Sequence, residues 1–179
     1  SDNVTGMKEL LEYIYSRGHR KIAYIHGAMP AVDLGTIIQL YRTAERLGLE
    51  IPDEYIREAA YRDTTTTYRV TNELLDLPDH DSIIYPDDFA SFGGINAIRQ
   101  RGLQIPEDIS VAGYDGIQAA RQLEPRLTTV QQDTEQIGCL AARELISLIE
   151  RPKTTIIEQV IVPGKVAEGK SVARIPTDN

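Results

Sequence analysis

The chain has 179 residues, enough for one or two domains, of which 41% are hydrophobic and 26% are charged. These proportions are typical of globular proteins and exclude disordered, collagen-like and coiled-coil chains. Lysine and arginine total 19 against 27 aspartates and glutamates, which gives a formal net charge of −8. An acidic surface repels phosphates, so this chain is a poor nucleic-acid binder, and any DNA contact must come from residues outside it.

No apolar stretch reaches the roughly 18 residues that a membrane-spanning helix needs. Residues 1–4 lack the basic and apolar regions of a signal peptide, so a cytoplasmic location is the simplest interpretation. The single cysteine, Cys139, has no second cysteine with which to form a disulfide or share a metal. We expect it to be a small buried residue in a helix.

Apolar runs bounded by turn residues alternate with segments of helical period, which predicts a parallel sheet flanked by helices. In the first predicted helix, apolar residues recur at three- and four-residue spacing from Val4 to Ile14, and the helix ends at Arg17-Gly18. The next predicted elements are a strand at 21–26, a helix from the loop 28–33 to Leu47, a short strand at 55–60, a helix at 66–75 and a strand at 82–85.

The second half of the chain continues the alternation. It comprises a helix at 89–101, a strand at 109–114 followed by Asp115, the apolar run 127–130, a helix at 133–149, a strand at 155–162 and a loose tail. In open α/β sheets, ligands bind at the carboxyl ends of the strands. The candidate binding loops are therefore those at 27–35, 60–66, 86–89 and 114–121.

Several short motifs recur together in this order and spacing. They are Ser1-Asp2-Asn3 before a helix, Gly18-His19-Arg20-Lys21-Ile22-Ala23, Asp87-Asp88 with Gly93, Arg101-Gly102-Leu103, the run from Ile105-Pro106-Glu107-Asp108 to Gly113-Tyr114-Asp115, and Pro125-Arg126-Leu127-Thr128-Thr129-Val130-Gln131-Gln132. Over residues 1–171 they resemble the effector-binding core of the lactose-repressor/galactose-repressor (LacI/GalR) family of bacterial transcriptional regulators.

The resemblance implies a type I periplasmic-binding-protein-like fold, in which the chain crosses three times between two subdomains and the effector lies in the cleft between them. It also implies that a helix-turn-helix, a hinge helix and most of the first subdomain lie outside this sequence. On that plan residues 1–130 are the second, C-terminal effector-binding subdomain, and 131–154 return to the first. Residues 155–171 are the terminal strand and crossover, and 172–179 are a tail.

The returning helix would then lack the surface on which the family packs it. Its apolar face consists of Ile137, Leu140, Ala141, Leu145 and Leu148. Leaving such a face in water costs about 25 cal/mol per Å². We therefore predict that it is buried against another copy of the chain or repacked; the alternative is that it folds onto its own sheet.

The resemblance also implies the candidate ligand-binding residues. Asp115 matches a family aspartate that accepts hydrogen bonds from effector hydroxyl or ring N–H groups, as an ionised carboxylate can. The alternative is that it caps the following turn. Asp87 stands where the family usually has asparagine, and Asp88 is expected to be the helix N-cap.

Other positions depart from the family pattern. Thr36 replaces an arginine that clamps the effector, and Gln39 replaces a glycine. Arg62 replaces an aromatic residue that often stacks on the effector, with Tyr61 beside it. Loss of the arginine argues against an effector bearing a carboxylate or phosphate, although Arg62 could supply a guanidinium. His26 ends a strand beside the expected cleft and could contact a ligand.

Two motifs favour other functions. Residues 164–171 match the phosphate-binding pattern G-x-x-x-x-G-K-[ST], but only a short segment interrupted by Pro176 follows, where a helix is required. The carboxylates Asp87, Asp88 and Asp115 could form a cation site or an acid/base pair. That pair is the strongest argument for an enzyme.

The sequence therefore favours a non-enzymatic, homodimeric sensor without a cofactor. It would bind a small effector, a sugar by preference, and modulate operator binding by a DNA-binding domain outside this chain. The alternatives are a periplasmic sugar-binding protein of a transporter and, third, a carboxylate-site enzyme. On its own the chain supplies one wall of the cleft, so we expect weak or absent effector affinity.

Overall fold

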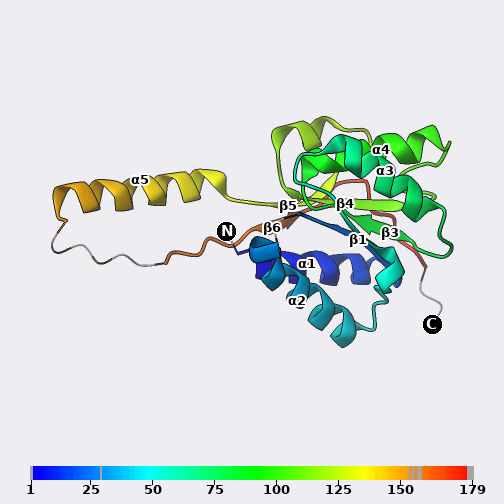
Figure 1. Cartoon of the computed structure of the whole chain (residues 1–179), viewed down its shortest axis with the longest axis horizontal. Coiled ribbons are helices and arrows are strands. Elements are labelled where there is room, and N and C mark those ends of the chain that lie inside the picture. The colour runs from blue at the N-terminus through cyan, green and yellow to red at the C-terminus, as the bar shows by residue number, and fades with distance from the viewer. Residues whose placement is uncertain (1, 29, 153, 155, 157–158, 177–179) are drawn as a thin grey trace.

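The computed structural model describes residues 2–28, 30–152, 154, 156 and 159–176. They form a six-stranded sheet with helices on both faces and one long helix that stands apart (Figure 1). The helices are α1 Asn3–Ser16, α2 Pro30–Leu47, α3 Thr64–Leu75, α4 Asp88–Gln100 and α5 Thr134–Glu150. The strands are β1 Ile22–His26, β2 Ile56–Glu58, β3 Ser82–Ile84, β4 Ser110–Asp115, β5 Thr128–Gln131 and β6 Lys165–Ala167.

The sheet has the strand order β2-β1-β3-β4-β5-β6. The first five strands are parallel, and only β6 runs antiparallel to its neighbour β5. The carboxyl ends of the parallel strands therefore share one edge, which confirms the predicted α/β class. α2 begins at Pro30, inside the predicted loop, because proline is favoured at the first position of a helix.

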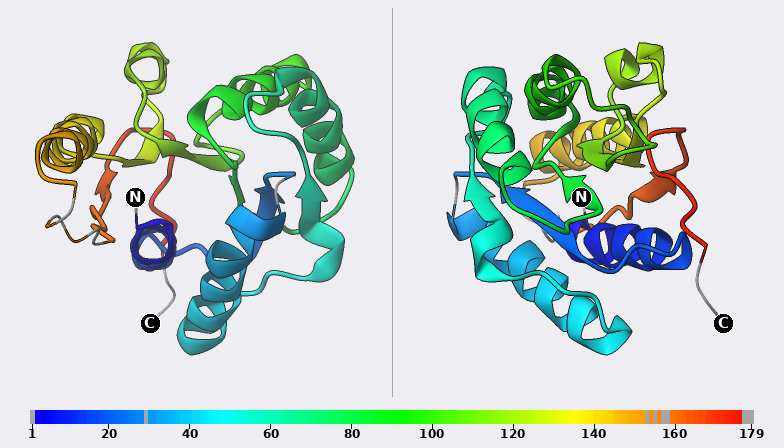
Figure 2. Two further views of the ribbon diagram at one scale, coloured as in Figure 1. Left: turned by 60° about the vertical axis from the view of Figure 1, so that its left-hand side comes forward. Right: turned by 90° about the vertical axis from the view of Figure 1, so that its right-hand side faces the viewer.

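Two apolar cores lie on opposite faces of the sheet. Alternate side chains of a strand point to opposite faces, so Ile22 and Tyr24 pack with α1 and α2, whereas Ala23 and Ile25 pack with α3 and α4. Figure 2 shows these helix pairs on either side of the strands. No helix in the described part of the chain combines the length and apolar character that crossing a bilayer requires.

The predicted strand at 155–162 is wrong for the residues that the structure describes there, 156 and 159–162. The apolar residues Val160, Ile161 and Val162 follow one another, but they form no ladder with a neighbouring strand; the Val162 carbonyl accepts a hydrogen bond from the Asp2 amide at 3.0 Å, and Ile156 is 78% exposed. The last strand is instead β6. The phosphate-binding pattern also fails, because residues 172–176 after it are not helical and the Ser171 hydroxyl donates to the Val111 carbonyl.

α5 confirms the predicted helix and contradicts one of the environments predicted for it. It extends away from the sheet, and none of its residues is buried (Figure 1). Leu145, Ile146 and Ile149 are 59%, 54% and 71% exposed, so folding onto the chain's own sheet is wrong. Cys139 is exposed as well, contrary to expectation, because no other described segment covers this helix. Burial against another copy stays a prediction.

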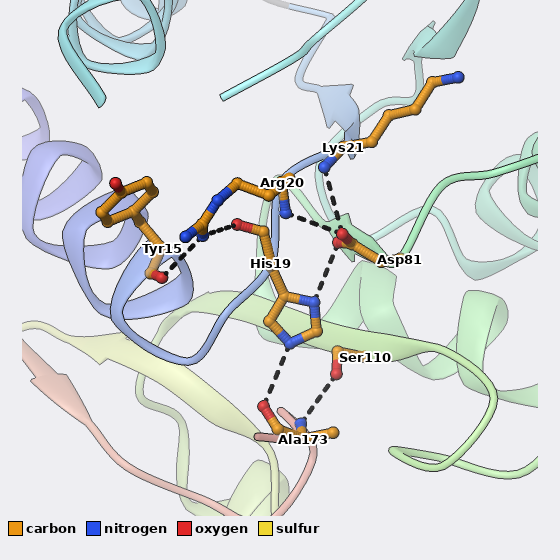
Figure 3. A network of polar contacts seen from close by, with 7 residues as sticks. All are labelled: Tyr15, His19, Arg20, Lys21, Asp81, Ser110 and Ala173. Atoms are coloured by element: carbon orange, nitrogen blue, oxygen red, sulfur yellow. Dashed lines mark hydrogen bonds and ion pairs between the residues drawn. The ribbon is translucent and has the colours of Figure 1, made fainter. Parts of the chain in front are cut away.

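The expected loose tail is wrong for residues 172–176, and 177–179 lie outside the described residues. Val172 is buried, and the fully buried His19 ties this segment to the sheet (Figure 3). His19 Nδ1 lies 2.9 Å from Asp81 Oδ1, and Nε2 lies 3.2 Å from the Ala173 carbonyl oxygen. The Ala173 amide donates to Ser110 Oγ at 2.8 Å. These contacts join α1, β3, β4 and the C-terminal segment.

Candidate functional site

A cavity of about 140 Å³ opens at the carboxyl edge of the sheet, where the candidate loops meet. Three of the predicted site residues line it: Thr36 from α2, Tyr61 from the loop after β2, and Asp115 from the end of β4. Each follows or ends an element of the parallel sheet, so the topology brings together residues that are far apart in sequence.

Three buried tyrosines form the aromatic part of the cavity wall. Tyr24 lies in β1, Tyr85 directly follows β3, and Tyr114 lies in β4. The Tyr114 hydroxyl donates to the Asn3 carbonyl at 3.3 Å, and the Tyr85 hydroxyl lies 3.2 Å from Thr71 Oγ1. Burial raises the pKa of Tyr85 and Tyr114, so both remain neutral phenols at physiological pH.

Asp115 is the carboxylate on this wall. Burial and the negative charge of Asp87 raise its pKa, while a hydrogen bond from Gln132 and the positive charge of Arg62 oppose the shift. Gln132 Nε2 donates to Asp115 Oδ1 at 2.5 Å. Asp115 has a positive φ of 107°, which is rare for a residue other than glycine. The carboxylate is thus held at the cavity by side-chain and backbone constraints.

The helix N-cap is the first of the two adjacent aspartates and not, as expected, the second. α4 begins at Asp88, one residue earlier than predicted, so Asp87 and not Asp88 is the N-cap. Asp87 Oδ1 accepts from the Ala90 amide at 2.7 Å, and Oδ2 accepts from the Arg62 amide at 2.8 Å. Asp88 lies in the first turn and is fully buried. The expectation for Asp88 was wrong because the helix start was misplaced.

Asp87, Arg62 and His26 are not among the residues that line the cavity. His26 Nδ1 lies 2.8 Å from the Gly27 carbonyl oxygen, and the Arg62 side chain is exposed. Arg62 has a positive φ of 61° in the turn before α3, where its amide binds Asp87. These residues surround the cavity and hold its loops.

Sequence reasoning missed seven lining residues other than glycine. They are Asn3, Met7, Tyr24, Tyr85, Pro86, Tyr114 and Gln132, of which Pro86 and Tyr114 fall inside candidate loops. The three tyrosines carried a usable signal, since each stands at or beside a predicted strand end. Asn3 and Met7 carried none, because only tertiary packing brings α1 to this edge.

The wall offers one carboxylate, amide and hydroxyl groups and aromatic faces, the donors and acceptors suited to a small polar ligand. Asp88 Oδ1 and Oδ2 already accept hydrogen bonds from Thr129 and from the Ile117 amide. Within the described residues no group of three or more His, Cys, Asp or Glu side chains could hold a metal ion. The three aspartates therefore do not converge as a cation site there.

Residues 11–172 match the model of the periplasmic binding protein-like domain. Over its full length the chain is 32% identical to the probable HTH-type transcriptional repressor ExuR of Bacillus subtilis (strain 168), covering 99% of this chain and 53% of that protein. The chain thus spans about half the length of the curated relatives it matches.

Two solved structures share the fold and at least a quarter of the sequence. The transcriptional regulator CelR–cellobiose complex has a TM-score of 0.86 and 26% identity, over 95% of this chain and 52% of that one. A LacI family regulator from Enterococcus faecium with bound ribose has a TM-score of 0.85 and 25% identity, over 98% and 65%. The chain therefore belongs to the periplasmic binding protein-like family, in the form that LacI-type transcriptional regulators carry.

Proposed function

We propose that this chain is the effector-binding part of a transcriptional regulator and that its effector is a small polyhydroxylated molecule, a sugar by preference. The observation that carries the proposal is the cavity at the carboxyl edge of the sheet, where Asp115 lies among buried tyrosines. The relatives support it, since ExuR is a repressor by name and two similar regulators were solved with cellobiose or ribose.

The chemistry of the wall fits such an effector. The Asp115 carboxylate would accept hydrogen bonds from ligand hydroxyls, and the tyrosine rings would face the C–H surface of a sugar ring. Thr36 and Tyr61 would add hydroxyl contacts from the neighbouring loops. Asp87, Arg62 and His26 would reach the ligand from the rim when the second wall of the cleft closes on it.

Regulation would follow from differential binding. An effector shifts the equilibrium between open and closed arrangements of the cleft only by as much as its affinity for the two differs. We infer that α5 returns to a second subdomain that supplies the other wall; the exposure of Leu145 and Ile149 supports this inference. Residues 1–130 would then form the effector-binding subdomain, with 155–171 as the terminal crossover.

The remaining parts of the proposal concern partners. DNA would be bound by a separate domain, because the net charge of −8 on this chain opposes contact with phosphates. Such a regulator acts in the cytoplasm, where its operator lies, and needs neither catalysis nor a cofactor. We also infer a homodimer, supported by the exposed Phe89 on α4, whose ring packs against the partly buried Phe92 with ring centroids 5.4 Å apart.

Two measurements test the proposal. The first is the amino-terminal sequence of the complete gene product, in which a helix-turn-helix supports a regulator and a cleaved signal peptide supports a transport receptor instead. The second is titration calorimetry of that protein with ribose, cellobiose and related sugars. We expect Asp115→Asn to weaken the tightest of these complexes and Asp108→Asn to leave it unchanged. Failure of all sugars would contradict the proposed effector class.

A further inference from the structure

The backbone at Asp115 is strained, and something must hold it. Asp115 has a φ of 107° and is followed by Gly116 with a φ of 72°. A non-glycine residue in such a conformation is energetically unfavourable and persists only where its surroundings fix it. The residues that supply this constraint therefore determine where the Asp115 carboxylate stands in the cavity wall.

Gln132 holds Asp115 itself, through its side chain and its amide, whereas the two amides that follow Asp115 lead to one buried group. The Ile117 amide donates to Asp88 Oδ2 at 2.8 Å. The Gly116 amide donates to Thr129 Oγ1 at 3.3 Å, and the Thr129 hydroxyl donates in turn to Asp88 Oδ1 at 2.6 Å. Both amides that follow Asp115 are thus held, directly or through Thr129, by the carboxylate of Asp88.

The location of Asp88 suits it to hold the 115–117 turn but does not allow direct contact with a ligand. Its side chain is fully buried in the first turn of α4, where the helix dipole favours a negative charge. The carboxylate fits against Gly113 of β4, where a Cβ atom would overlap Asp88 Oδ1. Because Gly113 has no side chain, β4 leaves space for the Asp88 carboxylate on α4. Asp88 does not line the cavity.

We propose that Asp88 is a positioning residue for the ligand-binding wall: acting with Thr129, it fixes the 115–117 turn and so holds Asp115 in its strained, cavity-lining conformation. The proposal rests on the proposed function for the meaning of Asp115 as a ligand contact. The constraint itself exists without a ligand, so it can be tested separately.

The test uses the 179-residue chain without ligand and follows residues 115–117 by nuclear magnetic resonance. In Asp88→Asn an amide group replaces the carboxylate that accepts from both Ile117 and Thr129. We expect the Gly116 and Ile117 amides to exchange with solvent about 10- to 100-fold faster, the factor that corresponds to loss of a hydrogen bond to a charged group. The amide-to-α-proton coupling of Asp115 should rise as its φ leaves positive values.

Matched variants separate positioning from general destabilisation. Thr129→Val removes the hydroxyl link in a similar volume and should reproduce both changes, whereas Thr129→Ser keeps the hydroxyl and should restore wild-type values. Asp108→Asn is the control, since Asp108 Oδ2 also accepts a backbone amide, that of Gln104, in a distant loop. Exchange within β4, at Val111, should stay unchanged in all variants.

Unchanged exchange and coupling in a folded Asp88→Asn would overturn the proposal, as would equal behaviour of Thr129→Val and Thr129→Ser. If Asp88→Asn does not fold, the Thr129 pair decides alone. Absence of sugar binding in the calorimetric experiment would refute the proposed function and leave this result untouched.

Discussion

At the scale of single residues, two aspartates near the cavity lie where burial makes a negative charge energetically costly. Asp115 stands on the cavity wall with its pKa raised by burial, and Asp88 is buried behind it. Neither aspartate gains stability for the fold from its negative charge. A ligand hydroxyl that donates a hydrogen bond to Asp115 would stabilise the charged carboxylate and so offset part of the cost of burying it.

We expect Asp115→Asn in the complete gene product to weaken effector binding by about 10- to 100-fold, because hydrogen bonds to a charged acceptor contribute about 1.5–3 kcal/mol. Titration calorimetry with the sugar that binds the wild type measures this loss. Wild-type affinity in the variant would show that the ligand does not bind the carboxylate.

Asp88 should make stability depend on pH in a recognisable way. Burial raises its pKa from 3.8 to about 6, against hydrogen bonds from Thr129 and Ile117. A raised carboxyl pKa means that stability is highest below pH 4 and falls as the pH rises through 6. The shift corresponds to on the order of 3 kcal/mol. The free energy of unfolding of Asp88→Asn, measured relative to that of the wild type, should therefore increase as the pH rises from 4 to 7.

Urea unfolding at several pH values measures this difference. Carboxyl groups far from Asp88 titrate equally in both proteins, so their contributions cancel; Asp115, whose charge interacts with Asp88, is the exception. Asp108→Asn serves as the control and should run parallel to the wild type. A constant difference between Asp88→Asn and the wild type over this range would mean that Asp88 is not buried as a carboxylate.

At the scale of elements, the sequence predicted what depends on local pattern. The strands of the parallel sheet and the helices between them follow from hydrophobic period and turn residues, and so does the edge where Thr36, Tyr61 and Asp115 meet. The link from Asp88 to Thr129 spans 41 residues and leaves no local signal. The false strand at 155–162 shows the converse, since a run of β-branched residues favours an extended backbone but does not supply the neighbouring strand with which it would pair.

The buried His19 side chain is one of the groups that hold the C-terminal segment, together with Ser110 and the Arg17 carbonyl. Although burial opposes the shift, hydrogen bonds from His19 and from the Arg20 and Lys21 amides lower the pKa of Asp81. We expect His19→Ala to lower the free energy of unfolding by about 3 kcal/mol, because it leaves a cavity and a half-buried carboxylate without its donor. The Ala173 amide should also exchange faster with solvent.

Chemical denaturation and hydrogen exchange measure these effects, and Asp79→Asn in the exposed loop nearby is the control, since asparagine tolerates the positive φ of 68° at this position. Because Asp81 has a lowered pKa, its contribution is present above pH 4 and disappears as the pH falls below that value. A His19→Ala protein as stable as the wild type, with its C-terminal amides protected, would contradict this account.

At the scale of the whole molecule, two helices carry apolar side chains that no contact within the described part of the chain buries. Leu145, Ile146 and Ile149 on α5 and Phe89 on α4 are each at least 45% exposed. Apolar surface of this kind favours association. We expect the 179-residue chain to self-associate at micromolar concentration and to bind sugars weakly or not at all, since one wall of a cleft cannot enclose a ligand.

Sedimentation equilibrium separates the two surfaces. Ile146→Glu with Ile149→Glu should reduce association if α5 is the contact, and Phe89→Glu should reduce it if α4 is. A monomeric wild-type chain would contradict the prediction for both surfaces. Micromolar binding of a sugar by this chain would contradict the one-wall argument.

The antiparallel pairing of β5 with β6 sets the route to and from α5. Gln131 lies opposite Lys165, so the chain leaves the sheet and re-enters it at neighbouring points. The segment between Gln131 and Lys165 is therefore an excursion from the sheet, whose two ends a tight turn could join at little entropic cost, although Val162 within it is buried and accepts a hydrogen bond from the Asp2 amide. A shortened chain of this kind would keep all six strands while losing the exposed helix, and would give the sheet and its cavity as a self-contained unit.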